Sequence, residues 1–307
     1  MKRAKRQGRQ YFCLEDGETK VMRSFLRYHG FGLTTLLGLQ RLGVFIPYRY
    51  VGRLAPPDVL PEVESFFQAA EPTFAAVLDA VDGVAKDLLA IANANGKSRS
   101  ASDRKPPRFS QTWFPRLDAA VAYALVRARA PKRILEIGAG HSTRFLARAV
   151  RDAKIDTEIK SIDPDPRAKL DGLAVHHIAA DVQDVGTDVF AALAPGDVLF
   201  IDSSHLLLPG SDVDILFSRI LPHLPAEVLI HIHDIFLPDS YPRDWAWRGY
   251  NEQQALTPLL MMERFKPVFA SHYVGTRMMD RLAKSVVASL PLPKGARESS
   301  LWLETRR

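Results

Sequence analysis

The sequence predicts an α/β protein with a doubly wound, mostly parallel sheet and an N-terminal helical extension. After residue 105, short apolar runs alternate with segments of helical period, and the first run ends in a glycine turn that opens a helix. Before residue 95, apolar residues recur at spacings of three and four without such runs. We therefore expect a basic tail, helices and a linker over residues 1–105 and the sheet domain over residues 106–307.

The N-terminal region combines positive charge with apolar residues. The chain has 307 residues and a net charge of +6, of which the first ten residues carry +5 without any acid, so that the other residues carry only +1. A near-neutral body gives no support to a nucleic-acid-binding surface. The basic tail itself suits solvent or, alternatively, an anionic membrane or polyanion.

The most apolar stretch of the N-terminal region covers residues 31–46. It is interrupted by Gln40 and Arg41 and is shorter than the roughly 20 residues that span a bilayer. Its depth in the chain and the lack of a small-residue cleavage site argue against a signal peptide. We expect a helix packed in the core, with docking on a membrane surface as the alternative.

The number of cysteines limits which cysteine-based sites are possible and suggests the cellular location. Cys13 is the single cysteine, which excludes an intramolecular disulfide and a zinc site built on several thiolates. A reducing, cytoplasmic location is therefore expected.

The remaining elements follow in chain order. Helical periodicity covers residues 61–93, where Pro72 starts a second helix. Residues 95–108 are rich in Gly, Ser, Pro and basic residues and predict a linker. Beyond it the sequence predicts helices at 115–130, 142–150 and 212–221, and strands at 133–137, before 163, and at 173–179, 198–201 and 228–235.

The sharpest motif is the glycine turn within residues 134–143. Gly138 and Gly140 allow a tight turn and the close approach of a ligand, and Ser142 can cap the helix that follows. Asp163 ends the next apolar run, 23 positions beyond Gly140, where a carboxylate can accept hydrogen bonds from ribose hydroxyls. The pattern indicates an adenosine-containing cofactor.

Two residues distinguish between such cofactors. Thr143 stands where a nicotinamide-binding turn has its third glycine, and Glu136 would repel a pyrophosphate but suits a cationic ligand. The segment resembles the first motif of the class I S-adenosylmethionine-dependent methyltransferases, an acidic residue followed by G-x-G at the end of strand one. The resemblance covers about residues 108–304. It implies a seven-stranded, Rossmann-like methyltransferase sheet whose last two strands, at 265–271 and 300–303, form an antiparallel hairpin.

The same resemblance implies which residues bind the cofactor. The methionine end would be lined by Glu136, Gly138 and Gly140, while Asp163 would hold the ribose and Asp181 would lie near the adenine. The expected cofactor-binding set is Glu136, Gly138, Gly140, Ser142, Asp163 and Asp181.

A candidate catalytic pair follows the strand at 198–201. Asp202 ends this strand and His205 comes three residues later, at the edge where open α/β sheets bind ligands. The region resembles the catechol-type O-methyltransferases, whose corresponding aspartate binds a divalent metal and whose lysine three positions on is the base. His205 takes the lysine's place, and an imidazole of pKa near 6.5 is suited to remove a hydroxyl proton. The alternative is that His205 only caps a loop.

The strand at 228–235 raises the question of a metal. Period two puts residues 231 and 233 on one face, with Asp234 at the mouth of the sheet. The catechol-type pattern has an acid followed by asparagine here, whereas Ile235 follows Asp234 in this chain. Asp202, His233 and Asp234 then form either a site for magnesium, manganese or iron or a hydrogen-bonded network that positions the histidine base.

Residues 236–253 complete the functional prediction. They combine aromatic rings with Asn251, Glu252 and Gln253, and resemble a group of bacterial methyltransferases of glycan or secondary-metabolite chemistry. These groups suit a polyhydroxylated or planar acceptor, with simple packing as the alternative. We therefore predict S-adenosylmethionine-dependent O-methylation of a sugar, glycan or small-molecule hydroxyl.

Two other functions and several partner classes stay open. A nicotinamide-dependent oxidoreductase and a non-catalytic, cofactor-binding scaffold are the alternatives to a methyltransferase. No nucleic-acid partner is expected, and the N-terminal region is a candidate for peripheral membrane contact or a homodimer contact.

Overall fold

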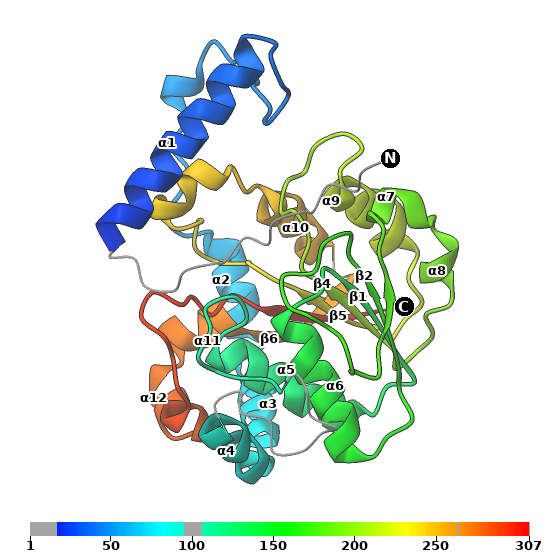
Figure 1. The fold of residues 1–307 in the computed structure, drawn as a ribbon. Coiled ribbons are helices and arrows are strands. Elements are labelled where there is room, and N and C mark those ends of the chain that lie inside the picture. Colours follow the sequence, from blue (N-terminus) through cyan, green and yellow to red (C-terminus); the bar gives the residue numbers. More distant parts are fainter. Residues whose placement is uncertain (1–16, 95–105, 263, 307) are drawn as a thin grey trace, which may run out of the picture. The chain divides into compact units, whose positions relative to one another are not determined.

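The computed structural model describes residues 17–94, 106–262 and 264–306 (Figure 1). The basic tail at residues 2–9, Cys13 and most of the predicted linker lie outside these ranges. The chain divides into two compact units, Met1–Pro56 with Pro242–Gly249 and Pro57–Tyr241 with Tyr250–Arg307.

The larger unit is built on a seven-stranded sheet of order β3-β2-β1-β4-β5-β7-β6, with flanking helices. Strands β1 to β5 are parallel, and β7 is inserted antiparallel between β5 and β6. This confirms the predicted fold class. The strands are β1 (Arg133–Ile137), β2 (Glu158–Ile162), β3 (His176–Ile178), β4 (Val198–Ile201), β5 (Leu229–Ile232), β6 (Phe265–Ala270) and β7 (Leu301–Thr305).

The last two strands pair antiparallel as predicted, but they do not form a hairpin with a tight turn. Two short helices and a 3-10 turn lie between them in the chain. The helices of the larger unit are α2 (Pro61–Gln68), α3 (Glu71–Gly83), α4 (Ala85–Ala94), α5 (Arg116–Arg129), α6 (His141–Ala153), α7 (Val182–Val185), α8 (Asp188–Ala191), α9 (Asp212–Ile215), α10 (Glu252–Met261), α11 (Ser271–Arg277) and α12 (Met279–Ala283). Shorter turns are the π-helical η2 (Leu216–Ile220) and the 3-10 helices η3 (Leu221–His223) and η5 (Val286–Ser289).

The central strands β4 and β5 form because all their side chains except His231 are apolar, on both faces of the sheet. All four residues of β4 and all four of β5 are buried, as expected where helices cover a parallel sheet on both sides. Helix α3 begins at Glu71 with Pro72 in its first turn, where a missing N–H costs nothing.

Helices α2, α3 and α4 belong to the sheet's unit, whereas the sequence grouped them with the N-terminal region. Phe74 of α3 packs edge-to-face on Phe269 of β6, with 5.9 Å between ring centroids. Phe67 of α2 contacts Tyr273 of α11 in the same way at 5.7 Å. Burial of these rings joins the helices to the core, so the division falls near residue 57 rather than residue 105.

The smaller unit contains α1 (Gly17–Leu36), η1 (Val51–Arg53) and η4 (Arg243–Arg248). Core packing of residues 31–46 was expected but is not found. The helix ends at Leu36, and Leu33, Leu39 and Phe45 are exposed. None of the described helices has both the length and the apolar content needed to cross a bilayer.

Candidate functional site

A cavity of about 390 Å³ opens beyond the carboxyl ends of β1, β2 and β4. This is the edge at which open α/β sheets bind ligands, and the volume is in the usual range for small-molecule sites. Five aspartates line the cavity against one arginine, Arg167. The acidic lining favours a ligand that is cationic or rich in hydroxyl groups. The aspartates are Asp163, Asp165, Asp181, Asp202 and Asp212.

The cavity wall leaves no room for a side chain at Gly138. Its φ is +82°, and a Cβ there would lie 1.9 Å from the carbonyl oxygen of Asp202. Gly140 is extended, does not line the cavity, and a Cβ there would meet only Cβ of Arg167 at 3.9 Å. The close approach of the β1 turn to the end of β4 therefore depends on Gly138.

Asp163 both lines the cavity and holds the glycine turn. One carboxylate oxygen accepts the N–H of Ala139 at 2.6 Å, and the other accepts the N–H of Asp165 at 2.7 Å. Asp181 also lines the cavity, just before α7. The roles implied for these two residues, at the ribose and the adenine, stay predictions.

Glu136 and Ser142 lie behind the cavity wall rather than in it. The Glu136 carboxylate is fully buried and accepts hydrogen bonds from Ser142 at 2.7 Å and from Thr143 and Ser161 at 2.8 Å each. Thr143 in turn accepts the N–H of Gly140 at 2.9 Å. Burial raises the pKa of Glu136 to about 7, although the three hydroxyls act to lower it. Its observed function is to tie the glycine turn to α6 and β2.

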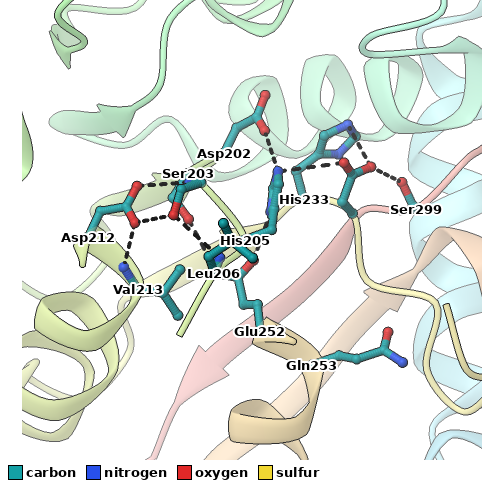
Figure 2. A network of polar contacts seen from close by, with 12 residues as sticks. Asp202, Ser203, His205, Leu206, Asp212, Val213, His233, Glu252, Gln253 and Ser299 are labelled. Carbon is teal, nitrogen blue, oxygen red and sulfur yellow. Dashed lines mark hydrogen bonds and ion pairs between the residues drawn. The ribbon is translucent and has the colours of Figure 1, made fainter. Parts of the chain in front are cut away.

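His205 is the centre of a buried network of carboxylates, which Figure 2 shows. Nδ1 of His205 lies 2.8 Å from Oε2 of Glu252, at the start of α10. On the other side of the ring, Nε2 lies 3.4 Å from Oδ1 of Asp202 and 3.5 Å from Oδ2 of Asp234. The Tyr250 ring packs on the imidazole, with 4.6 Å between centroids. The structure thus brings the predicted pair His205 and Asp202 together and adds two further carboxylates.

The network favours the protonated form of His205. Burial alone would lower the pKa of His205, but hydrogen bonds to Asp202 and Glu252 and the surrounding negative charge raise that pKa well above 6.5. Burial would raise the pKa of Asp202, but the charge of His233 and the bond to His205 hold it well below its usual range. Burial raises the pKa of Glu252 despite its bond to His205. The expectation of an ordinary histidine pKa is therefore wrong.

The backbone at this network is also unusual. His205 and Asp234 have φ values of +61° and +54°, the left-handed region that costs non-glycine residues roughly 1 kcal/mol each or more. The Oγ of Ser299 donates to Asp234 at 3.0 Å and fixes its carboxylate. Such conformations persist only where the surroundings impose them, and they cluster at functional sites.

Asp202, His233 and Asp234 had two interpretations, a metal site or a hydrogen-bonded network. Across residues 17–94, 106–262 and 264–306, no three His, Cys, Asp or Glu side chains are grouped to hold a metal ion. Nε2 of His233 lies 2.9 Å from the carbonyl oxygen of Trp113, and because a carbonyl only accepts, this nitrogen carries a hydrogen and has no lone pair for a metal. The imidazolium of His205 lies between Asp202 and Asp234 instead. The geometry is that of the alternative, a hydrogen-bonded network.

Two of the three polar residues at 251–253 hydrogen-bond to the backbone of neighbouring segments. Asn251 accepts the N–H of Leu207 at 2.7 Å, and Gln253 accepts the N–H of Phe236 at 3.1 Å. The sequence offered Glu252 as an acceptor-binding group and did not pair it with His205. Its separation of 47 residues from His205 left no spacing signal, and only its place in an acid-amide cluster singled it out.

Comparison with known proteins agrees with this geometry. Residues 135–235 match the family model described as a methyltransferase domain. No curated protein matches the chain.

Among solved structures, the chain is similar to an S-adenosylhomocysteine-bound methyltransferase of Podospora anserina. The two sequences are 17% identical, and the alignment covers 87% of this chain and 100% of that chain with a TM-score of 0.41. A plantazolicin methyltransferase bound to S-adenosylhomocysteine has 16% identity over 76% of this chain and 100% of that chain, with a TM-score of 0.40. The matched segment runs from β1 through the end of β5 and contains the glycine turn, Asp163, Asp202 and His205. Residues 135–235 of the chain therefore match a methyltransferase domain, set on a seven-stranded, Rossmann-like sheet.

Proposed function

We propose that this enzyme transfers the methyl group of S-adenosylmethionine to a hydroxyl oxygen of a sugar, glycan or small-molecule acceptor. The observation that supports it best is the contact of Nε2 of His205 with Asp202, whose side chain also lines the cavity. A proton-accepting group beside the cofactor cavity is what an oxygen acceptor needs, because a neutral hydroxyl is a weak nucleophile.

The cavity residues fit the cofactor. When bound, S-adenosylmethionine supplies an electrophilic methyl group on a sulfonium that departs as a neutral thioether. The acidic lining suits the positive charge of that ligand, and Asp163 and Asp181 offer carboxylates to its hydroxyl and amino groups. Gly138 keeps the backbone of the turn close to β4 and the wall free of a side chain.

His205 is assigned as the general base in its neutral form. With Nδ1 bound to Glu252, the nitrogen that faces Asp202 and Asp234 is Nε2, which accepts the hydroxyl proton as the oxygen–methyl bond forms. Because the carboxylates stabilise the imidazolium, Nε2 must first release a proton. The catalytic rate is therefore expected to rise with pH over a range well above the usual histidine pKa of 6.5.

Transfer of labelled methyl from S-adenosylmethionine to a panel of sugars, phenols and lipid-linked glycans tests the proposal. A base-stable methyl ether that forms with the wild type and not with His205→Ala supports it. Calorimetric binding of NAD in place of S-adenosylmethionine would point instead to an oxidoreductase. Tight S-adenosylmethionine binding with no transfer to any acceptor would favour a scaffold role.

A further inference from the structure

The chain presents an apolar segment that buries none of its side chains. Over residues 26–56 every residue is exposed except Thr34 and Thr35, which are half-buried. Of the 22 exposed large apolar residues in the described part of the chain, 15 lie between Leu26 and Leu54. An apolar surface of this extent marks an interaction site, since monomeric proteins rarely leave one uncovered.

The same region concentrates the positive charge of the protein. Residues 1–56 contain 11 Lys and Arg against three Asp and Glu, a net charge of +8, which leaves −2 for residues 57–307. The basic character therefore belongs to the apolar segment and its preceding tail, and not to the methyltransferase domain.

Arginines and aromatic rings are interleaved along the segment. The Arg27 guanidinium lies 5.0 Å from the centroid of the Phe31 ring, and the guanidinium groups of Arg49 and Arg53 lie 5.5 and 4.9 Å from that of Tyr50. Arginine and tyrosine both combine an apolar body with a polar end, which suits them to the boundary between lipid and water.

We propose that residues 26–56 dock this chain on an anionic membrane surface. A bilayer can cover scattered apolar side chains without a matching shape, and acidic headgroups attract the basic residues between them. The contact is with the surface, because no described helix is long and apolar enough to span a bilayer. A second copy of the same segment is a poorer partner, because residues 26–56 carry four arginines and no acid, and two such surfaces would repel one another.

Co-sedimentation of the full-length protein with vesicles tests the proposal. Phosphatidylcholine vesicles are compared with phosphatidylcholine vesicles containing phosphatidylglycerol, at low and high salt. We expect binding to the anionic vesicles that weakens with salt. Arg49→Gln with Arg53→Gln is expected to lower the partition coefficient about 25-fold, at roughly fivefold for each basic residue. Phe45→Ser with Ile46→Ser is expected to lower it at least about tenfold.

Matched controls come from the larger unit. Met262→Ser with Met279→Ser removes exposed apolar groups, and Lys266→Gln with Lys284→Gln removes exposed charges. Both control variants should bind vesicles as the wild type does.

Four results would overturn the proposal. They are absence of vesicle binding, binding that does not depend on headgroup charge or salt, equal losses in the control variants, and binding that neither variant of the segment weakens. A concentration-dependent dimer that Phe45→Ser with Ile46→Ser abolishes, without vesicle binding, would identify a second copy as the partner. A lower melting temperature of that variant without vesicles, with no vesicle binding by the wild type, would show that the segment packs on its own chain.

Discussion

Glu252 holds His205 from a position 47 residues later in the chain, with 2.8 Å between Oε2 and Nδ1. The carboxylate is fully buried and the imidazole nearly so. This contact fixes which nitrogen of the ring faces Asp202 and Asp234. It also makes Glu252 a positioning residue whose effect on catalysis can be separated from that of His205.

Removal of the His205 side chain tests most directly whether His205 is the general base. His205→Ala is expected to lower kcat about 10²- to 10⁴-fold while the affinity for S-adenosylmethionine is largely kept, because the lost group acts on the acceptor. Single-turnover transfer and calorimetric titration measure the two quantities. An unchanged pH dependence of the residual rate would contradict the assignment.

Replacing the positioning residue Glu252 should change the pH dependence of the transfer rate. Glu252→Gln removes one of the groups that raise the pKa of His205, so the rising limb of the rate profile should move to lower pH than in the wild type. A purely structural role would lower the rate at all pH values without moving the limb. Circular dichroism of the variant checks that the fold is intact.

Substitution by alanine should cost more stability at Gly138 than at Gly140. Gly138→Ala places a Cβ against the carbonyl of Asp202 at a positive φ, and we expect a loss of more than about 2 kcal/mol in the free energy of unfolding. Gly140→Ala meets only Arg167 and should cost less than about 1 kcal/mol. Urea denaturation of both variants measures the difference, and equal costs would contradict the description of the turn.

The network around His205 predicts that methyl transfer does not depend on a metal. Since Nε2 of His233 donates to Trp113 and His205 lies between the two carboxylates, exhaustive chelation should leave the transfer rate unchanged. Loss of activity on chelation that added Mg²⁺ restores would show that Asp202 and Asp234 rearrange around a metal. Apparent rates are compared before chelation, after it and after readdition.

Glu136 should make stability depend on pH. Its pKa in the folded protein is about 7 against an ordinary value of 4.5, so its stabilising contribution is complete below pH 4.5 and is lost as pH rises through 7. The loss can reach about 3 kcal/mol, at 1.36 kcal/mol for each pKa unit. Glu136→Gln should remove this decline, which urea titrations of both proteins at pH 5 and pH 8 will measure. Parallel pH dependence in the two proteins would contradict the raised pKa.

The sequence by itself determined the sheet and the edge of the sheet at which the site lies. Alternating apolar runs and helical segments fix a parallel sheet, because only that arrangement buries strands on both faces. Gly138, Asp163 and Asp202 follow strand ends, and parallel strands bring their carboxyl ends to one edge. These residues could be assigned to the cavity wall without coordinates.

Only the tertiary structure decided the directions of side chains and the charges they carry. Glu136 lies in the strand that leads to Gly138, yet three hydroxyls from other elements hold its carboxylate away from the cavity. The pKa of His205 depends on carboxylates that come from three separate parts of the chain, among them Glu252. Burial and distance act through space, so a pattern of spacing along the chain cannot contain them.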